Sequence, residues 1–400
     1  MTSNKITVIL IIFLLLAVVP TSKAETLFGK NWQWHGFAAQ GVIDVKGSNF
    51  VTDDKGVSTK LSEFGVNTSV QLASNLRFAA QAVYLNGGNR YFEGARVDYL
   101  LLDWTFLNTS KWQGNLYLGR FKNVHWLYSS VRNIPFVRPS IILPQSVYFD
   151  GFRDIAVGAD GSALKISYND GYIGDFDFNF SYGTSPISKK QQQIILSEFA
   201  QGKAEQDFDA QASLYWRPAL SQWRFGLSLL DSDFSYRQAN VDFFTSAKFA
   251  FQFYTLNALY EGEQWEFSGE IYQERFVTKG LVYPQFLQDS IGQGMYLQSR
   301  YKWDDNITLL MRYEKFYSDK EDKKGKKLAL NSGGRTPSYF AFQNDLTIGA
   351  SFDVTNNMQV RLEQHWVAGT SRLTPVTLPN PLLNDHKNWQ ITAVQLMYWF

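Results

Sequence analysis

The sequence predicts an all-β protein, a transmembrane antiparallel β-barrel of sixteen strands with one long connection folded into its lumen. Three observations support this prediction. Apolar and polar residues alternate with period two through many segments, most of them about 10 to 14 residues long. The connections between these segments are alternately short and long. Aromatic residues make up 16% of the chain, and its last three residues are Tyr398, Trp399 and Phe400.

The N-terminus predicts export from the cytoplasm. Lys5 precedes an apolar run over residues 6–19, and residues 22–24 (Ser-Lys-Ala) place small side chains where a signal peptidase cleaves. The run is shorter than the roughly 18 to 20 residues that a membrane-spanning helix needs. We therefore expect residues 1–24 to be a cleaved signal peptide and residues 25–400 to form one barrel domain. An uncleaved signal anchor is the alternative.

The alternation is clearest in residues 175–182, Asp-Phe-Asp-Phe-Asn-Phe-Ser-Tyr. Successive side chains of a strand point to opposite faces, so this segment has one apolar wall and one polar wall. A soluble β-sandwich buries the apolar wall against a second sheet, whereas a membrane barrel turns it to lipid. The segments are longer than the roughly five or six residues typical of soluble strands, which favours the barrel.

An even number of strands brings both termini to the periplasmic end of a barrel, together with the short turns. The long connections then lie on the outer side of the membrane. The predicted strands are residues 33–45, 59–71, 76–86, 95–107, 112–122, 155–168, 174–183, 206–216, 222–236, 245–261, 264–277, 293–303, 306–318, 342–354, 358–370 and 388–400.

Sixteen strands enclose an aqueous channel, so we expect passage of solutes. The connection over residues 123–154 is the longest and is too apolar for an exposed loop, so we expect it to fold inward. Its Arg132, Arg138 and Arg153 are the predicted pore constriction, where an arginine cluster favours anions. The alternative is that these arginines pair with carboxylates of the barrel wall and fix the loop.

The strand faces assigned to the lumen carry both signs of charge. Opposite charges across a channel orient polar or zwitterionic solutes rather than select one sign. The alternation leaves the orientation of strands 95–107 and 112–122 ambiguous. The predicted pore-lining residues are Arg77, Arg120, Lys122, Arg300, Arg312, Arg361, Asp177, Glu266 and Glu270.

Other chemistries find little support in the sequence. The absence of cysteine excludes disulfides, thiolate metal sites and cysteine nucleophiles. None of the four histidines stands at a spacing that singles out a catalytic pair, so we expect no enzyme, no cofactor and no metal. Removing Lys5 and Lys23 from the 38 basic residues leaves 36 against 37 acidic ones, which argues against a nucleic-acid partner.

The chain resembles the outer-membrane porins of Gram-negative bacteria. Residues 118–123 (Leu-Gly-Arg-Phe-Lys-Asn) and 138–150 (Arg-Pro-Ser-Ile-Ile-Leu-Pro-Gln-Ser-Val-Tyr-Phe-Asp) look like a strand and constriction loop of a branch related to the phosphate-selective porins. This resemblance implies a sixteen-stranded barrel, commonly trimeric, with the folded-in loop lining the pore. The phosphate-specific members carry arginine and lysine ladders, and the acidic residues of this sequence depart from that pattern.

The C-terminus predicts how the barrel closes and assembles. Phe400 and Tyr398 share one strand face that should meet lipid, at the level of the aromatic girdle. A terminal Phe after alternating apolar residues resembles the signal that the outer-membrane insertion machinery reads. Phe400 and Tyr398 are therefore the predicted assembly signal.

These observations favour a passive porin of the outer membrane, a water-filled channel for small hydrophilic solutes that has a preference for anions or zwitterions if the arginines face the solute. The alternatives are a substrate-specific outer-membrane transporter for hydrophobic or aromatic compounds, and a structural barrel without a channel. The expected partners are outer-membrane lipid and lipopolysaccharide, further copies of the chain in a homotrimer, and the barrel-assembly machinery.

Overall fold

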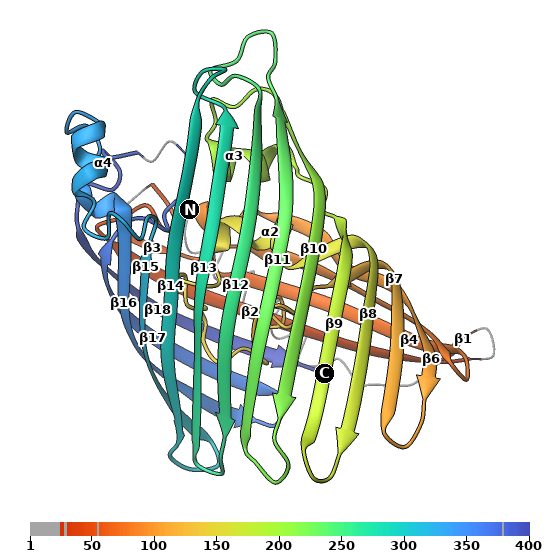
Figure 1. Cartoon of the computed structure of the whole chain (residues 1–400). Coiled ribbons are helices and arrows are strands. Elements are labelled where there is room, and N and C mark those ends of the chain that lie inside the picture. The colour runs from red at the N-terminus through yellow and green to blue at the C-terminus, as the bar shows by residue number, and fades with distance from the viewer. Residues whose placement is uncertain (1–24, 28–29, 54–55, 378–379) are drawn as a thin grey trace.

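The strands of the protein form one antiparallel sheet that closes on itself. A computed structural model describes residues 25–27, 30–53, 56–377 and 380–400. The last strand, β18 (Asn388–Trp399), pairs with β2 (Lys30–Lys46) and so closes a barrel of sixteen strands (Figure 1). The predicted fold is confirmed. The predicted signal peptide lies outside the described residues.

Two short strands add to this wall: β1 (Glu25–Leu27) and β3 (Gly56–Ser58) both pair with β2. Neighbouring strands of the wall are consecutive in the sequence, as in an up-and-down barrel. From β2 to β18 the wall consists of β4 (Ser62–Ala73), β5 (Leu76–Asn86), β6 (Gly94–Asn108), β7 (Trp112–Lys122), β8 (Gly158–Asp170), β9 (Gly174–Thr184), β10 (Lys203–Arg217), β11 (Trp223–Arg237), β12 (Ala247–Glu261), β13 (Trp265–Gly280), β14 (Leu287–Lys302), β15 (Ile307–Tyr317), β16 (Phe342–Thr355) and β17 (Met358–Gly369).

Most predicted strand boundaries lie within two residues of the observed ones, five differ by three residues and one differs by six. The strand predicted from residue 155 begins at Gly158, because the short helix α2 (Arg153–Ala156) occupies the preceding residues. The strand predicted from residue 293 begins at Leu287. Residues 288–290 (Gln-Asp-Ser) are polar and poor strand formers, but they pair with β13, where the ion pair between Arg275 and Asp289 measures 2.6 Å.

Each strand has one face toward the barrel interior and one toward the outside, as the period-two pattern predicts. On β13 the side chains of Trp265, Phe267 and Ile271 are exposed, whereas Ser268 and Glu270 are buried. Exposed apolar side chains recur around the outer wall on nearly every strand. This is the inverse of a soluble protein and matches a wall that faces lipid.

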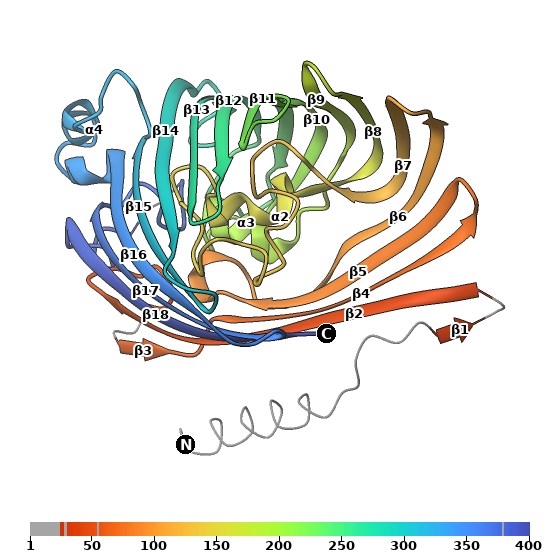
Figure 2. The same cartoon turned by 90° about the horizontal axis from the view of Figure 1, so that it is seen from below.

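The short turns lie at one end of the barrel and the long connections at the other (Figure 1). We call these the short-turn end and the long-loop end. The connection between β7 and β8, residues 123–157, enters the barrel from the long-loop end and lies inside it (Figure 2). We call this segment the interior loop. It includes η2 (Asp150–Phe152) and α2.

Three other connections contain short helices: η1 (Gly88–Arg90) follows β5, α3 (Lys189–Leu196) follows β9, and α4 (Lys326–Asn331) with η3 (Ser338–Ala341) precedes β16. Helix α3 contacts the interior loop. The Gln191 side-chain amide donates to the Gly151 carbonyl at 2.6 Å. None of the helices among the described residues is long and apolar enough to cross a membrane.

The end of the chain forms the closing seam. The Phe400 amide donates to the Gly36 carbonyl at 3.0 Å, and the Gly36 amide donates to the Phe400 carbonyl at 3.1 Å. The Tyr398 and Phe400 rings are 6.4 Å apart, as neighbours on one face of the strand. Trp399 points inward and stacks on Phe136 of the interior loop, with ring centroids 4.9 Å apart. The terminal residues therefore join β2, β18 and the loop.

Deletion of Phe400 removes both of these backbone hydrogen bonds and the last ring of the seam. We expect the yield of folded, membrane-inserted barrel to fall several-fold, while the conductance of each barrel that does insert stays unchanged. Heat-modifiable migration in electrophoresis measures the folded fraction. Phe400→Tyr, which keeps the backbone and a ring, is the matched control, and normal yield of the deletion variant would contradict the assembly role.

Candidate functional site: the barrel lumen and its interior loop

Carboxylates of the barrel wall hold the interior loop by its backbone. Glu270 of β13 accepts from the Leu127 amide at 3.2 Å, and Glu314 of β15 accepts from the Ser146 amide at 2.6 Å. Glu363 of β17 accepts from the two successive amides of residues 141 and 142. Charged acceptors make hydrogen bonds about twice as strong as neutral ones. The loop that leaves β7 is thus fixed to strands on the far side of the lumen.

Two wall arginines complete this attachment by donating to loop carbonyls. Arg312 of β15 donates to the Ile142 carbonyl and the Ser140 hydroxyl, both at 3.0 Å. Arg361 of β17 donates to the Pro135 carbonyl at 3.1 Å. Both arginine side chains are buried by the loop. They face the interior as expected, but the loop separates them from any solute.

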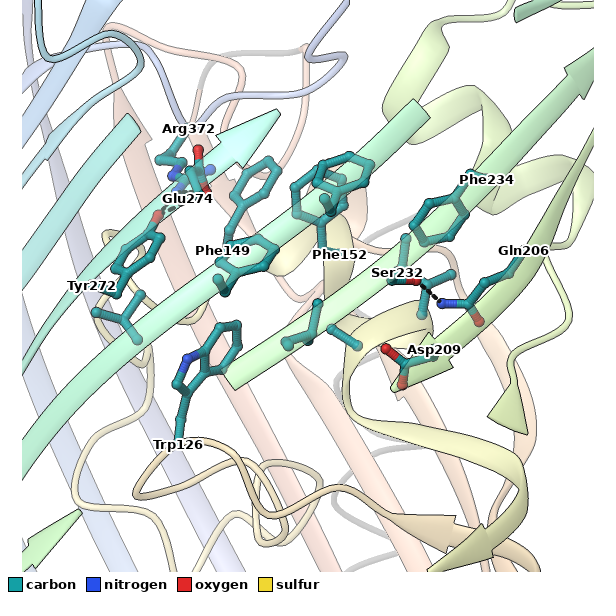
Figure 3. A pocket seen from close by; sticks show the side chains of 16 residues that line it. Trp126, Phe149, Phe152, Gln206, Asp209, Ser232, Phe234, Tyr272, Glu274 and Arg372 are labelled. Carbon is teal, nitrogen blue, oxygen red and sulfur yellow. Dashed lines mark hydrogen bonds and ion pairs between the residues drawn. The ribbon is translucent and has the colours of Figure 1, made fainter. Parts of the chain in front are cut away.

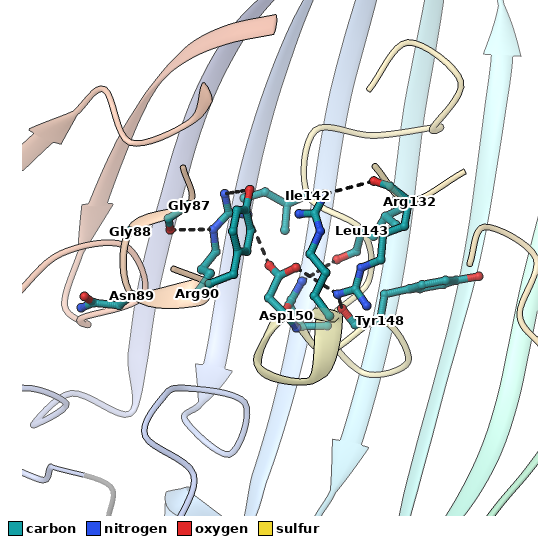
Figure 4. Close-up of polar contacts among 12 residues, drawn as sticks. Gly87, Gly88, Asn89, Arg90, Arg132, Ile142, Leu143, Tyr148 and Asp150 are labelled. Carbon is teal, nitrogen blue, oxygen red and sulfur yellow. Dashed lines mark hydrogen bonds and ion pairs between the residues drawn. The ribbon is translucent and has the colours of Figure 1, made fainter. Parts of the chain in front are cut away.

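The three arginines of the predicted constriction are less than 4% exposed. Arg138 donates to Glu63 of β4 at 2.9 Å, and Arg153 lies 3.7 Å from the other oxygen of the same carboxylate. Arg132 pairs with Asp150 at 3.0 Å, and Arg90 of η1 pairs with that carboxylate at 3.3 Å (Figure 4). Four guanidinium groups therefore share two buried carboxylates.

This arrangement favours the second of the two roles that the sequence left open for Arg132, Arg138 and Arg153, the attachment of the loop. Each of the three is covered and contacts a carboxylate that it shares with a second arginine. A lone arginine buried in this way would cost several kcal/mol, which is why each has a partner. Glu63 and Arg90 complete the cluster and were not predicted. Glu63 precedes the apolar Phe64 on its strand. This alternation is the one sequence signal that could have placed Glu63 on the interior face.

The remaining predicted pore-lining residues occupy different parts of the lumen. Arg300 and Glu266 face each other on neighbouring strands at 2.7 Å, each about a quarter exposed. Glu270 is buried and accepts from the Tyr296 hydroxyl at 3.0 Å. Arg77, Lys122 and Asp177 also face the interior, where they contact Asp103, Asp98 and Ser167 at 3.5, 2.6 and 2.5 Å.

Arg120 is the exception among the pore-lining predictions. It continues the face of Leu118, which is 47% exposed, and pairs with Asp160 of β8 at 3.2 Å. It also lies opposite the exposed Leu100 of β6 in the strand register. The even-numbered residues of β7 therefore face outward along most of this strand. The prediction for Arg120 was wrong, because the apolar residues of β7 alternate too weakly to assign its faces from sequence.

The half of the lumen near the short-turn end is polar. A cavity of about 710 Å³ there is lined by Arg77, Asp103, Lys165 and further polar side chains of β4 to β8. It shares Tyr117 and Lys165 with a cavity of about 320 Å³ that lies deeper in the barrel, between the β7 to β10 wall and the start of the interior loop. Lys122, Asn123 and Gln211 line this second cavity.

The half of the lumen near the long-loop end is aromatic. A narrow cavity lies between the interior loop and strands β10 to β13 (Figure 3), and its empty space of about 500 Å³ includes open solvent. It shares six lining residues with a larger space of about 2160 Å³ that opens at the long-loop end, so the two are continuous. The aromatic residues of this joint space are Trp126, Phe149, Phe152, Phe234, Phe249, Phe251, Phe253, Tyr272, Phe276, Phe286, Phe316 and Phe340.

Asp209 of β10 lines the aromatic cavity, at the end away from Arg372 (Figure 3). One of its oxygens, Oδ2, accepts from the Gln211 amide at 2.7 Å and from the Asn123 amide at 3.2 Å. Gln211 and Asn123 themselves line the second cavity, of about 320 Å³. Asp209 and its two amide partners therefore stand between the aromatic cavity and this second cavity, which share no lining residue.

His365 of β17 has carboxylate neighbours but no access to solvent. Its Nδ1 lies 2.8 Å from Asp345 and its Nε2 lies 3.3 Å from Glu363, while its side chain is fully buried. Because Glu363 also holds the interior loop, His365 is part of the same attachment. Among the described residues, no group of three or more His, Asp or Glu side chains is placed to hold a metal ion.

Solved structures with this fold are outer-membrane proteins. The outer membrane channel DcaP of Acinetobacter baumannii is 10% identical, with a TM-score of 0.59 over 95% of this chain and 100% of that chain. An anion-selective porin from Comamonas acidovorans is 12% identical, with a TM-score of 0.58 over 93% and 100%. OmpT, an outer membrane protein of Vibrio cholerae, is 11% identical, with a TM-score of 0.57 over 96% and 100%.

At these identities the likeness concerns the fold. No family model and no curated protein matches the chain. The similarity extends over nearly the whole length of both chains, so it includes the complete barrel wall.

Replacement of Glu63 by Gln tests the role of the buried cluster. Arg138 and Arg153 would keep their charges without the one carboxylate that both contact, so we expect a loss of roughly 3–5 kcal/mol of unfolding free energy. Denaturant unfolding in detergent measures it. The matched control is Asp289→Asn, which breaks an exposed ion pair and should cost about 1 kcal/mol or less. Equal costs for the two variants would show that the cluster does not hold the loop.

Proposed function

We propose that the protein is a porin-type channel in the outer membrane of a Gram-negative bacterium, with the short-turn end in the periplasm. The observation that carries the proposal is the interior loop, which narrows the lumen without filling it. Its backbone is fixed by Glu270, Glu314 and Glu363 on the far wall, and a series of cavities passes along its other side. The exposed apolar outer wall and the porin-like fold support the location.

The charges that remain accessible to a solute are of both signs. Arg77 at the polar mouth is 50% exposed, with Asp103 beside it, and Lys165 lines the same cavity. The buried arginines of the interior loop leave no ladder of exposed cations for phosphate. We therefore propose weak ion selectivity that is set by the charges at the polar mouth. The resemblance to phosphate-selective porins does not lead us to propose a preference for phosphate.

A second candidate function is transport of hydrophobic or aromatic compounds. The aromatic space at the long-loop end favours it, because water and salt alone give no reason to line a channel with a dozen aromatic side chains. The two functions are compatible, since a solute that binds in the aromatic half would leave through the polar half.

We also propose that copies of the chain associate in the membrane as a homotrimer. Polar contacts on the outer wall support this: Arg120 pairs with Asp160, and the Thr392 hydroxyl donates to Gln364 at 2.6 Å. Such groups are better covered by another protein surface than by lipid. Native mass measurement in detergent tests this, and a monomer under all solubilising conditions would contradict it. Lipopolysaccharide and the barrel-assembly machinery are further proposed partners.

Purified protein in planar lipid bilayers should produce stepwise, voltage-independent increases of current at low potential, as expected of a channel whose cavities lie along one side of the loop. Heat-modifiable migration on the same sample establishes that the barrel is folded. Silence of folded protein over many insertions would reject the channel and favour the structural barrel.

Replacement of Arg77 by Ala removes the most accessible cation of the polar mouth. The reversal potential in a salt gradient should shift toward cation preference relative to the wild type. Arg275→Ala, on the outer wall, is the matched control and should leave the potential unchanged. An unchanged potential in the Arg77 variant would place the selective charges elsewhere.

A further inference from the structure

The aromatic cavity beside the interior loop has the composition of a binding site rather than of a plain conduit. Three adjoining strands present their interior faces to it, with Phe234 from β11, Phe251 and Phe253 from β12, and Tyr272 from β13. The Phe251 and Phe253 rings are stacked 6.3 Å apart, with an angle of 2° between their planes. Concave, largely apolar pockets with a few polar groups are the usual sites of small-molecule binding.

The polar groups of this cavity are unequal at its two ends. At the end that adjoins the larger space, the Arg372 guanidinium lies 3.3 Å from Glu274 and over the Phe316 ring, 3.4 Å from its centroid. It also donates to the Tyr272 hydroxyl. The charges of Arg372 and Glu274 therefore cancel, and the guanidinium is already bound on its face and its edge.

At the opposite end of the cavity, Asp209 has no cation beside it. None of the ion pairs among the described residues includes it, although its side chain is only 2% exposed. Both hydrogen bonds that Asp209 accepts from the described residues, from Gln211 and Asn123, go to Oδ2. Oδ1 accepts none from the described residues, and Asp209 lines the cavity (Figure 3). A nearly buried carboxylate with a free acceptor oxygen is a strong attractor for a positive charge.

Resting on the proposed channel function, we infer that the aromatic cavity binds amphipathic organic cations. The apolar body of such a solute packs among Phe234, Phe251 and Phe253, and its ammonium head donates to Asp209 Oδ1. The faces of the aromatic rings add to the attraction for the positive head. An anion of the same shape meets the charge of Asp209, while Arg372 is occupied. A sugar lacks the apolar body and would find few hydrogen-bond partners.

The position of Asp209 places the bound cation at the partition between two cavities. Asn123 and Gln211 contact Asp209 from one side and line the second cavity on the other. A solute whose head reaches Asp209 has therefore reached the boundary between the aromatic and the polar half. Its apolar body stays among the rings while its head meets the first wet groups.

The test uses full-length protein in planar bilayers and three probes, of which 2-phenylethylammonium and 3-phenylpropionate are similar in size. We expect 2-phenylethylammonium to interrupt the current in a concentration-dependent way, and 3-phenylpropionate and ethanolammonium to do so weakly. The first comparison isolates the charge and the second isolates the ring. Asp209→Asn, which keeps the shape, should raise the half-blocking concentration of 2-phenylethylammonium roughly tenfold or more. Asp177→Asn, in the polar half on β9, is the matched control and should leave it unchanged.

Block by 3-phenylpropionate at equal concentration, or an unchanged response of the Asp209 variant, would overturn the inference while leaving the channel intact. If folded protein gives no current at all, the channel proposal fails first. Binding of 2-phenylethylammonium is then measured by equilibrium dialysis of wild type and Asp209→Asn in detergent. Equal binding to both proteins rejects the site, and weaker binding to the variant supports it.

Discussion

The interior of this barrel depends on the hydrogen bonds that wall carboxylates accept from the backbone amides of the interior loop. In a sixteen-stranded wall the backbone N–H and C=O groups pair between neighbouring strands. A loop that enters the lumen brings backbone polar groups that have no neighbouring strand to pair with. Glu270, Glu314 and Glu363 accept from the loop backbone, and Arg312 and Arg361 donate to it. Without these contacts the loop would have to leave its amides and carbonyls to water, and the lumen would be one wide opening.

The same logic explains why so many charges of the lumen are buried. A charged side chain on the inner wall of a channel is ordinarily solvated, and here the loop covers several of them. Each covered charge has an opposite charge or a backbone dipole beside it, as buried charges require. Asp209 departs from this rule, since only amides contact it. The departure occurs beside the aromatic cavity, where a ligand can supply the missing partner.

The wall of the barrel was predictable from the sequence, whereas the lumen was not. Alternation along a strand such as β9 reports which face is apolar, and this is enough to place strands to within a few residues. It fails where a face is mixed, as on β7, and there Arg120 was assigned to the wrong side. Alternation also reports nothing about contacts between distant segments. Arg138 was recognised as part of an inward loop, but its partner Glu63 lies 75 positions away.

The stack of Trp399 on Phe136 connects two events in the life of the chain. The interior loop lies about a third of the way along the sequence, yet the ring on which it rests belongs to β18, the last strand of the wall. The lumen therefore reaches its final packing only when the seam between β18 and β2 has closed. A barrel without residue 399 lacks both the edge of the wall and the support of the loop. Closure of the wall and packing of its interior thus depend on the same residue.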